Sequence, residues 1–311
     1  MAFFDRFRVE LRKYADGVHD LGAPLPSIAT LDLASLPPGL VDFLRSWDGV
    51  RLFHDTVIIL PLAEQEQRDG VRILGEWPDG TLELAADGRV RSRDDDGAAI
   101  IVGATLELFL TAMMAREGLL VDREGEFKDV FDEEGIDERV RVKQTAAALK
   151  IDPEAAAWHL EAAERAFGAG EDAAAEAALA RAVALDEDAG DAWALLGALQ
   201  RRAARFDAAA ASFARAAATT PNGAARAERA AEAARAAAEG SHEDVRAAQA
   251  AVAVAADAGV VARWLDEARA LLADGDSEGA FNRASLAAAI DAGASGELLR
   301  QTRVRAKLKM I

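Results

Sequence analysis

Residues 190–221 read GDAWALLGALQRRAARFDAAAASFARAAATTP, and this stretch decides the fold of the C-terminal half. Large and small residues recur in it at the spacing of two helices that lie side by side. Trp193 and Phe213 are placed to fill the seam between the helices, and Gly197 allows a close approach. Pro221 cannot continue the second helix, so it ends the unit. Because such a hairpin cannot bury its apolar face alone, we expect stacked neighbours.

Weaker copies of this unit flank it. A unit 34 residues earlier carries Trp158, and a unit near the C-terminus carries Trp264. Trp264 follows Trp193 by 71 residues, which is two such periods plus three, and this predicts an insertion of about three residues near Glu239. The pattern predicts an all-α helical-repeat domain over residues 151–291.

The strongest unit resembles the tetratricopeptide repeat (TPR) family, through W-x2-L-G, A-x3-F and a closing Pro within residues 190–221. The resemblance implies protein binding on the inner faces of the helices. It places Arg201, Arg202 and Arg269 on those inner faces, as candidate partner-binding residues.

Residues 1–122 have a different pattern. An amphipathic N-terminal helix and a second helix that ends at Asp48-Gly49 precede several short β-rich runs. Asp87-Gly88, set between alternating apolar residues, predicts a hairpin. Residues 105–120 follow as a closing helix. Hairpin-joined strands with helices at either end indicate an α+β fold with an antiparallel sheet.

This N-terminal half resembles the SMI1/KNR4 family, also called the SUKH superfamily. The resemblance rests on Leu36-Pro37 opening a helix, Trp47-Asp48-Gly49 ending it, and an apolar strand ending at Leu60-Pro61-Leu62. Asp48 stands where the family often has Asn. The resemblance implies no enzymatic activity. Many bacterial members of the family are immunity proteins that bind and block a toxin, and others are interaction modules.

The chain is acidic throughout. It has 311 residues and a net charge of −18, of which −9 falls in residues 1–122, −2 in 123–150 and −7 in 151–311. Phosphate backbones would be repelled, so no direct nucleic-acid binding is expected. Charge steering favours a basic protein partner, such as a toxin domain. The alternative is that the acidity serves solubility alone.

Two further groups of residues are candidates for partner binding. The acidic run Asp94, Asp95 and Asp96 is one, although most such runs are solvated loops. Trp47 and Asp48, at the end of a helix, are the other. Trp47 is either a surface anchor or part of a small core, and the core alternative is the favoured one.

No catalytic, metal or cofactor site is expected. Cysteine is absent, the four histidines do not form H-x-x-x-H, and neither a nucleophile elbow nor a Walker A sequence occurs. Gly168–Ala173 matches a loose dinucleotide fingerprint but falls between helices. Asp274–Gly279 begins like a calcium loop, yet Ser285 stands where the bidentate Glu belongs.

Four segments are expected. They are an α+β domain (1–122), a charged linker that turns helical towards its end (123–150), the helical repeats (151–291) and a basic C-terminal capping helix (292–311). Charges near the N-terminus argue against a secretory signal, and no uncharged run is long enough to span a bilayer. We therefore expect a cytoplasmic protein, and the excess of Ala and Arg suggests a bacterial one.

The favoured hypothesis is a non-enzymatic immunity-type protein that neutralises a bacterial toxin by occlusion. The alternative is a cytoplasmic TPR scaffold or adaptor that assembles a protein complex.

Overall fold

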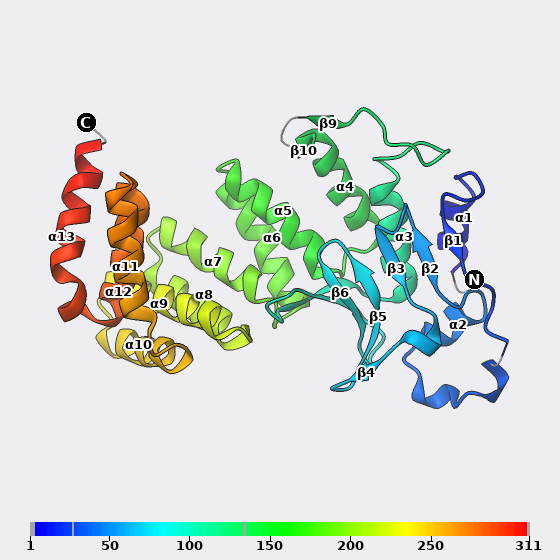
Figure 1. Ribbon diagram of the computed structural model, residues 1–311, viewed down its shortest axis with the longest axis horizontal. Coiled ribbons are helices and arrows are strands. Elements are labelled where there is room, and N and C mark those ends of the chain that lie inside the picture. Colours follow the sequence, from blue (N-terminus) through cyan, green and yellow to red (C-terminus); the bar gives the residue numbers. More distant parts are fainter. Residues whose placement is uncertain (1–3, 27, 133–134, 310–311) are drawn as a thin grey trace. The chain divides into compact units, whose positions relative to one another are not determined.

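The computed structural model describes residues 4–26, 28–132 and 135–309 (Figure 1). The chain divides into two compact units, Met1–Glu187 and Asp188–Ile311. They are called unit 1 and unit 2 below, and each is described by itself.

Unit 1 is built on an eight-stranded antiparallel sheet with the strand order β1-β2-β3-β5-β6-β7-β8, in which β4 also pairs with β5. Its strands are β1 (Asp20–Leu21), β2 (Val50–Leu52), β3 (Val57–Ile59), β4 (Gln67–Arg68), β5 (Val71–Trp77), β6 (Gly80–Leu84), β7 (Val90–Arg93) and β8 (Ala99–Gly103). The predicted hairpin is confirmed, because β6 pairs with β7 and Gly88, at φ 89°, lies in the turn. The short 3-10 helices are η1 (Ile28–Thr30), η2 (Leu33–Ser35) and η3 (Leu62–Glu64).

The core of unit 1 is aromatic where α1 (Asp5–Leu11) meets α2 (Leu40–Leu44). Phe4, Phe7, Phe43 and Trp47 form a cluster of edge-to-face and tilted rings, with centroids 5.4–6.5 Å apart. Such pairs add to the stabilisation from burial. The helix α3 (Leu106–Glu117) completes this core with Leu106, Phe109 and Leu110.

The segment predicted as a charged linker contains β9 (Phe131–Asp132), β10 (Gly135–Ile136) and α4 (Glu138–Ile151). The helix α4 packs on α3 and buries Gln144, Thr145 and Ala148, so it is an integral helix of unit 1. The apolar residues between its charges cause this, because they give α4 one face that can be buried. The segment limits inferred from the sequence stay a prediction.

Helices that follow the sheet in the chain pack against its last strand, β8. Two helices, α5 (Ala156–Gly168) and α6 (Asp172–Leu185), follow α4 in unit 1. Asp186 Oδ2 accepts a hydrogen bond from the Ile101 amide of β8 at 2.9 Å, and Asp152 Oδ2 accepts one from the Ala104 amide at 2.8 Å. Among the described residues no further strand pairs with β8, so Asp186 satisfies a donor of this edge strand, and Asp152 satisfies the amide of Ala104, which directly follows Gly103 at the strand end.

Unit 2 is all-α. Its helices are α7 (Gly190–Arg202), α8 (Phe206–Thr219), α9 (Gly223–Glu239), α10 (Glu243–Ala256), α11 (Val260–Ala273), α12 (Ser277–Ile290) and α13 (Ala292–Lys309). Consecutive helices pack as hairpins, except that α10 and α11 meet at 89° and make little contact. The predicted fold class is confirmed: an α+β domain with an antiparallel sheet is followed by all-α helical repeats.

Small residues set the spacing of the α7–α8 hairpin. A Cβ atom on Gly197 would lie 2.9 Å from the Phe213 ring, and Ala209 is completely buried beside it. The close approach predicted at Gly197 is therefore confirmed. Trp193, predicted to fill this seam, is only half-buried, whereas Trp264 of α11 is 2% exposed and lies in the core of unit 2.

The predicted insertion is an extra helical turn. The helix α9 has 17 residues and ends at Glu239, whereas α7 has 13. Beyond this longer helix, the last hairpin packs through α12 on α9 and α10. Three polar contacts hold α12 there: Arg235 Nη1 to Asn282 Oδ1 at 2.7 Å, Arg246 Nη1 to Ala289 O at 2.8 Å, and Arg283 Nη1 to Glu228 Oε1 at 2.9 Å.

Replacing Gly197 with Leu is expected to destabilise unit 2 by about 1–3 kcal/mol, because the new side chain would overlap the Phe213 ring. Gly168→Leu is the matched control: Gly168 ends α5, and a Cβ there meets nothing within 4 Å. The control should be neutral or slightly stabilising. Urea denaturation measures both, and equal effects would contradict the close approach.

Replacing Asp186 with Ala removes the acceptor of the buried Ile101 amide, and this should cost about 1–3 kcal/mol of unit 1 stability. Amide hydrogen exchange at Ile101 should accelerate with it. Glu171→Ala, an exposed position whose side chain caps nothing, is the control and should leave that amide protected. Unchanged protection in the Asp186 variant would show that the carboxylate does not hold the strand.

Candidate functional site

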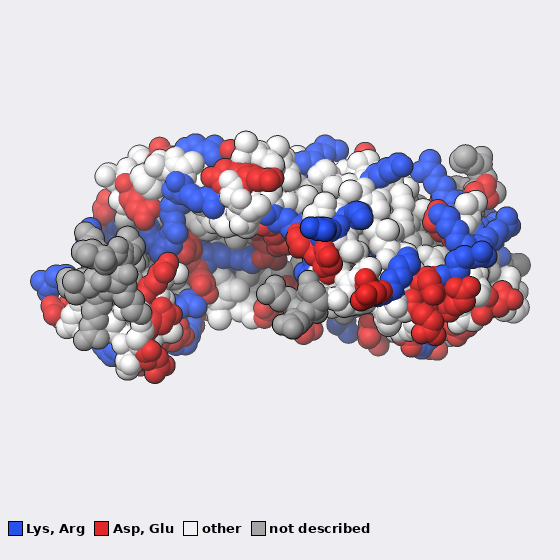
Figure 2. Space-filling view, turned by 90° about the horizontal axis from the view of Figure 1, so that it is seen from above, with Lys and Arg blue, Asp and Glu red and all other residues white. Residues whose placement is uncertain are grey.

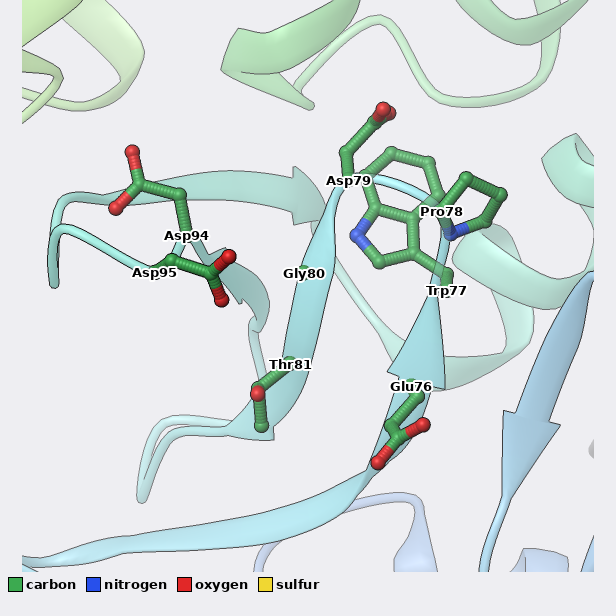
Figure 3. Close-up of a pocket in the computed structure, with 8 residues that line it drawn as sticks. All are labelled: Glu76, Trp77, Pro78, Asp79, Gly80, Thr81, Asp94 and Asp95. Atoms are coloured by element: carbon green, nitrogen blue, oxygen red, sulfur yellow. The ribbon is translucent and has the colours of Figure 1, made fainter.

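Unit 1 has an acidic hollow with a volume of about 380 Å³ between the β5–β6 and β7–β8 turns. It is lined by Glu76, Trp77, Pro78, Asp79, Gly80, Thr81, Asp94 and Asp95. Figure 3 shows Asp94 and Asp95 on one side and Glu76 on the other, with Gly80 between them, while the Asp79 carboxylate points away. The name "acidic hollow" is kept for this site.

Local sequence makes the floor of the acidic hollow rigid. Gly80 has φ 134°, and a Cβ atom there would lie 2.2 Å from the Arg93 carbonyl oxygen, so glycine is required. The Trp77 indole donates to Ser92 Oγ at 2.6 Å. Asp94 Oδ1 accepts from the Ala98 amide at 2.8 Å, which fixes the turn that carries Asp95.

The charge of the acidic hollow comes from exposed carboxylates. Glu76, Asp94 and Asp95 are exposed. Asp79 is exposed as well, but partial desolvation of its carboxyl raises its pKa, partly offset by Arg116. On the face drawn in Figure 2, positive and negative side chains are interspersed, so this face carries no continuous acidic surface. The acidic character of the hollow is therefore local.

The other candidates in unit 1 lie elsewhere. Asp96 is exposed in the β7–β8 turn but does not line the acidic hollow. Trp47 is 8% exposed, beneath the Arg8 guanidinium, which lies 5.2 Å from its ring centroid. Asp48 Oδ1 accepts from the Leu62 amide at 2.7 Å. Trp47 and Asp48 thus support the fold, which is the core alternative.

An exposed aromatic pair escaped the sequence analysis. Phe127 is 64% exposed and Phe131 46% exposed, with ring centroids 5.7 Å apart at 81°. His54, which lies 6.5 Å from Phe127, belongs to the turn Phe53–Asp55, where every residue has a positive φ. The signal was two Phe residues in a segment interpreted as a charged linker. Exposed aromatic residues of this kind are typical anchors of protein interfaces.

Unit 2 has a cavity of about 670 Å³ that we call the arginine cavity. Arg201 of α7, Arg235 of α9 and Arg246 of α10 line it, together with Glu239 and Glu243. Residues of α12 and α13, among them Phe281 and Leu299, complete its wall. Of the three arginines predicted as partner-binding, only Arg201 lies here. Arg202 is exposed outside this wall, and Arg269 is exposed and paired with Asp266.

A buried carboxyl group lies behind the arginine cavity. Glu232 of α9 accepts from Arg201 Nη1 at 2.9 Å and from Arg235 Nη2 at 2.8 Å. Its side chain is 18% exposed. Burial raises the pKa of Glu232 to about 7, against the attraction of Arg201 and with the repulsion of Glu228 and Glu239. Burial also raises the pKa of Glu239.

Among the residues that the structure describes, no group of three or more His, Cys, Asp or Glu side chains is placed to hold a metal ion. Within the same residues, no single helix has both the length and the apolar composition to cross a bilayer, although α10 and α11 pass that test as a bent pair.

Comparison with solved structures finds weak similarity over about half of the chain. The crystal structure of YrrB, titled a TPR protein with an unusual peptide-binding site, is 18% identical, with a TM-score of 0.36, and covers 53% of this chain and 82% of its own. The Cut9–Hcn1 hetero-tetramer of the APC/C is 14% identical, with a TM-score of 0.25, and covers 53% of this chain and 39% of its own. No family model and no curated protein matches the chain.

The raised pKa of Glu232 predicts a pH-dependent stability. The folded state binds more protons than the unfolded state between pH 4.5 and about 7, so this group's contribution to the free energy of unfolding falls as pH rises through that range. Glu232→Gln mimics the protonated form. Its melting temperature, relative to the wild-type chain, should therefore rise between pH 5 and pH 8.

The control for this prediction is Glu243→Gln. Arg246 lowers the pKa of Glu243, so the stability that Glu243 contributes is complete above its unfolded pKa of about 4.5. The difference between this variant and the wild-type chain should stay constant from pH 5 to pH 8. A constant difference for Glu232→Gln as well would show that Glu232 keeps an ordinary pKa.

Proposed function

We propose that this chain is a non-enzymatic protein-binding protein whose acidic hollow receives a basic side chain from a protein partner. The observation that carries the proposal is the acidic hollow itself. Three exposed carboxylates surround a rigid floor, in a space of about 380 Å³, which has room for a Lys or Arg side chain. The charge of −9 over residues 1–122 steers a basic partner towards it.

A protein is favoured over a small cation as the partner. Exposed ion pairs contribute only about 0–1 kcal/mol each, so the acidic hollow alone gives weak binding. A specific complex needs aromatic anchors as well, and unit 1 exposes Phe127 and Phe131. We assign the acidic hollow to specificity and rate of association, and the aromatic pair to affinity.

Toxin neutralisation is the more specific form of this proposal. It rests on the resemblance of residues 1–122 to the SMI1/KNR4 family and on the acidity that a basic catalytic cleft would attract. The alternative is a cytoplasmic scaffold that joins protein partners without inhibiting them. Loss of the partner's enzymatic activity on binding separates the first from the second.

Affinity purification with the full chain tests the proposal, using Asp94→Asn/Asp95→Asn beside Asp16→Asn/Asp20→Asn. Both pairs are exposed acids of unit 1, so each variant loses the same charge. A specific partner should be retained by the wild type and the control. It should bind about tenfold more weakly to the variant of the acidic hollow, and weaken with added salt.

The purified partner then gives the decisive measurement, which is its affinity for the three chains. Equal affinity for all three would contradict the assignment of the acidic hollow. Tight binding that persists in the doubly substituted chain but is lost in Phe127→Ala would transfer the site to the aromatic pair. Turnover of a small molecule by the purified chain would contradict the non-enzymatic proposal.

A further inference from the structure

We propose that the arginine cavity of unit 2 is a second binding site, for a carboxylate of an acidic peptide, in which the ligand replaces Glu232 as the partner of Arg201 and Arg235. The site is independent of the acidic hollow and takes the opposite charge. The argument uses the donors in its wall, its apolar surface and the charges around Glu232.

The donors converge from three helices. Arg201, Arg235 and Arg246 come from α7, α9 and α10, and each is held by contacts inside unit 2. Asn282 orients Arg235 at 2.7 Å, and the Ala289 carbonyl orients Arg246 at 2.8 Å. Guanidinium groups fixed in this way are preorganised for a carboxylate, which they bind through paired N–H donors.

One of these donors has no acceptor. The side chain of Arg235 is 11% exposed, and its Nε atom is buried without a hydrogen-bond partner among the described residues. A buried, charged N–H group without an acceptor is costly. The Arg235 guanidinium is therefore incompletely paired within the part of the chain that the structure describes.

The remaining wall favours a peptide over a small anion. Phe281, Leu299 and the alanines Ala238, Ala288, Ala289 and Ala292 line the same cavity. Its volume of about 670 Å³ exceeds the needs of one carboxylate and has room for an apolar side chain beside it. We therefore assign the site to an acidic residue next to an aliphatic one.

Glu232 occupies the arginine pair in the absence of ligand. Two ionised carboxylates cannot share the pair cheaply, so ligand binding is linked to uptake of a proton by Glu232. In the cavity wall, the negative charges of Glu239 and Glu243 offset two of the three positive charges of the arginines. Once Glu232 is neutral, the wall keeps an excess of one positive charge.

The groups around Glu232 come from all the helices packed on α9. The charged and titratable groups there include Arg201 of α7, Asp207 of α8, Glu228, Arg235 and Glu239 of α9, His242, Glu243 and Arg246 at the start of α10, Glu267 of α11 and Arg283 of α12. Asp207 pairs with His242, and Arg283 pairs with Glu228 and Glu267. Burial affects Glu232 more than any of these charged groups does, and it raises the pKa of Glu232 to about 7.

The test measures binding of a fluorescent peptide, Leu-Glu-Leu-Glu-Leu, to the full chain by anisotropy at pH 6 and pH 8. If binding requires protonated Glu232, affinity should be about tenfold higher at pH 6 than at pH 8, the ratio of the protonated fractions. The same peptide with Gln in place of Glu should not bind. Glu232→Gln should bind at pH 8 as tightly as the wild type does at pH 6.

Two arginine variants complete the test. Arg201→Gln should weaken binding at least about tenfold, whereas Arg269→Gln, outside the cavity, should leave it unchanged. Equal binding of the Gln peptide, or a pH dependence as large in Glu232→Gln as in the wild type, would overturn the proposal. Competition by inorganic phosphate as strong as that by unlabelled peptide would overturn the peptide assignment. Because Glu232→Gln keeps the size of the side chain, it decides the matter even if Arg201→Gln does not fold.

Discussion

The architecture of unit 1 depends on the hydrogen bonds that Asp186 accepts from the backbone of β8 and Asp152 accepts from Ala104, directly after that strand. An open sheet edge exposes N–H groups that invite pairing with another chain. Here carboxylates from the helical segment take the place of a further strand. The rings of Trp158 on α5 and Trp77 on β5, 5.9 Å apart, bury the apolar surface beside them. Because both contacts join α5 and α6 to the sheet, the helices are a continuation of the core and not a separate body.

Unit 2 obtains its cavity from a change in helix length. Alanine allows the helices of unit 2 to pack closely, and the absence of a side chain at Gly197 leaves room for α8 against α7. The extra turn of α9 extends it to Glu239, and the following hairpin packs through α12. Arg235 and Arg246 hold this hairpin by contacts with α12, and Arg283 of α12 holds it by a contact with α9. Two of these arginines, Arg235 and Arg246, also line the cavity.

The two units carry sites of opposite charge within an acidic chain. In unit 1, Glu76, Asp94 and Asp95 are exposed; β5 carries Glu76, and a hydrogen-bonded turn carries Asp94 and Asp95. In unit 2, a carboxyl group is buried among arginines at a cost in desolvation, which its raised pKa reports. The net charge of −18 does not predict the arginine cavity.

Patterns that act over a few residues determined the two-part fold from the sequence. The spacing of Trp193, Gly197 and Phe213 predicts a helical hairpin, and Asp87-Gly88 predicts a β-hairpin, because each depends on local backbone and packing constraints. Burial depends on distant partners, and only the tertiary structure decided it. It placed Trp47 inside and Phe127 outside, and it brought Asn282 to Arg235 from 47 positions along the chain. Residues far apart in sequence meet only when helices and strands pack, so no local sequence pattern predicts such a site.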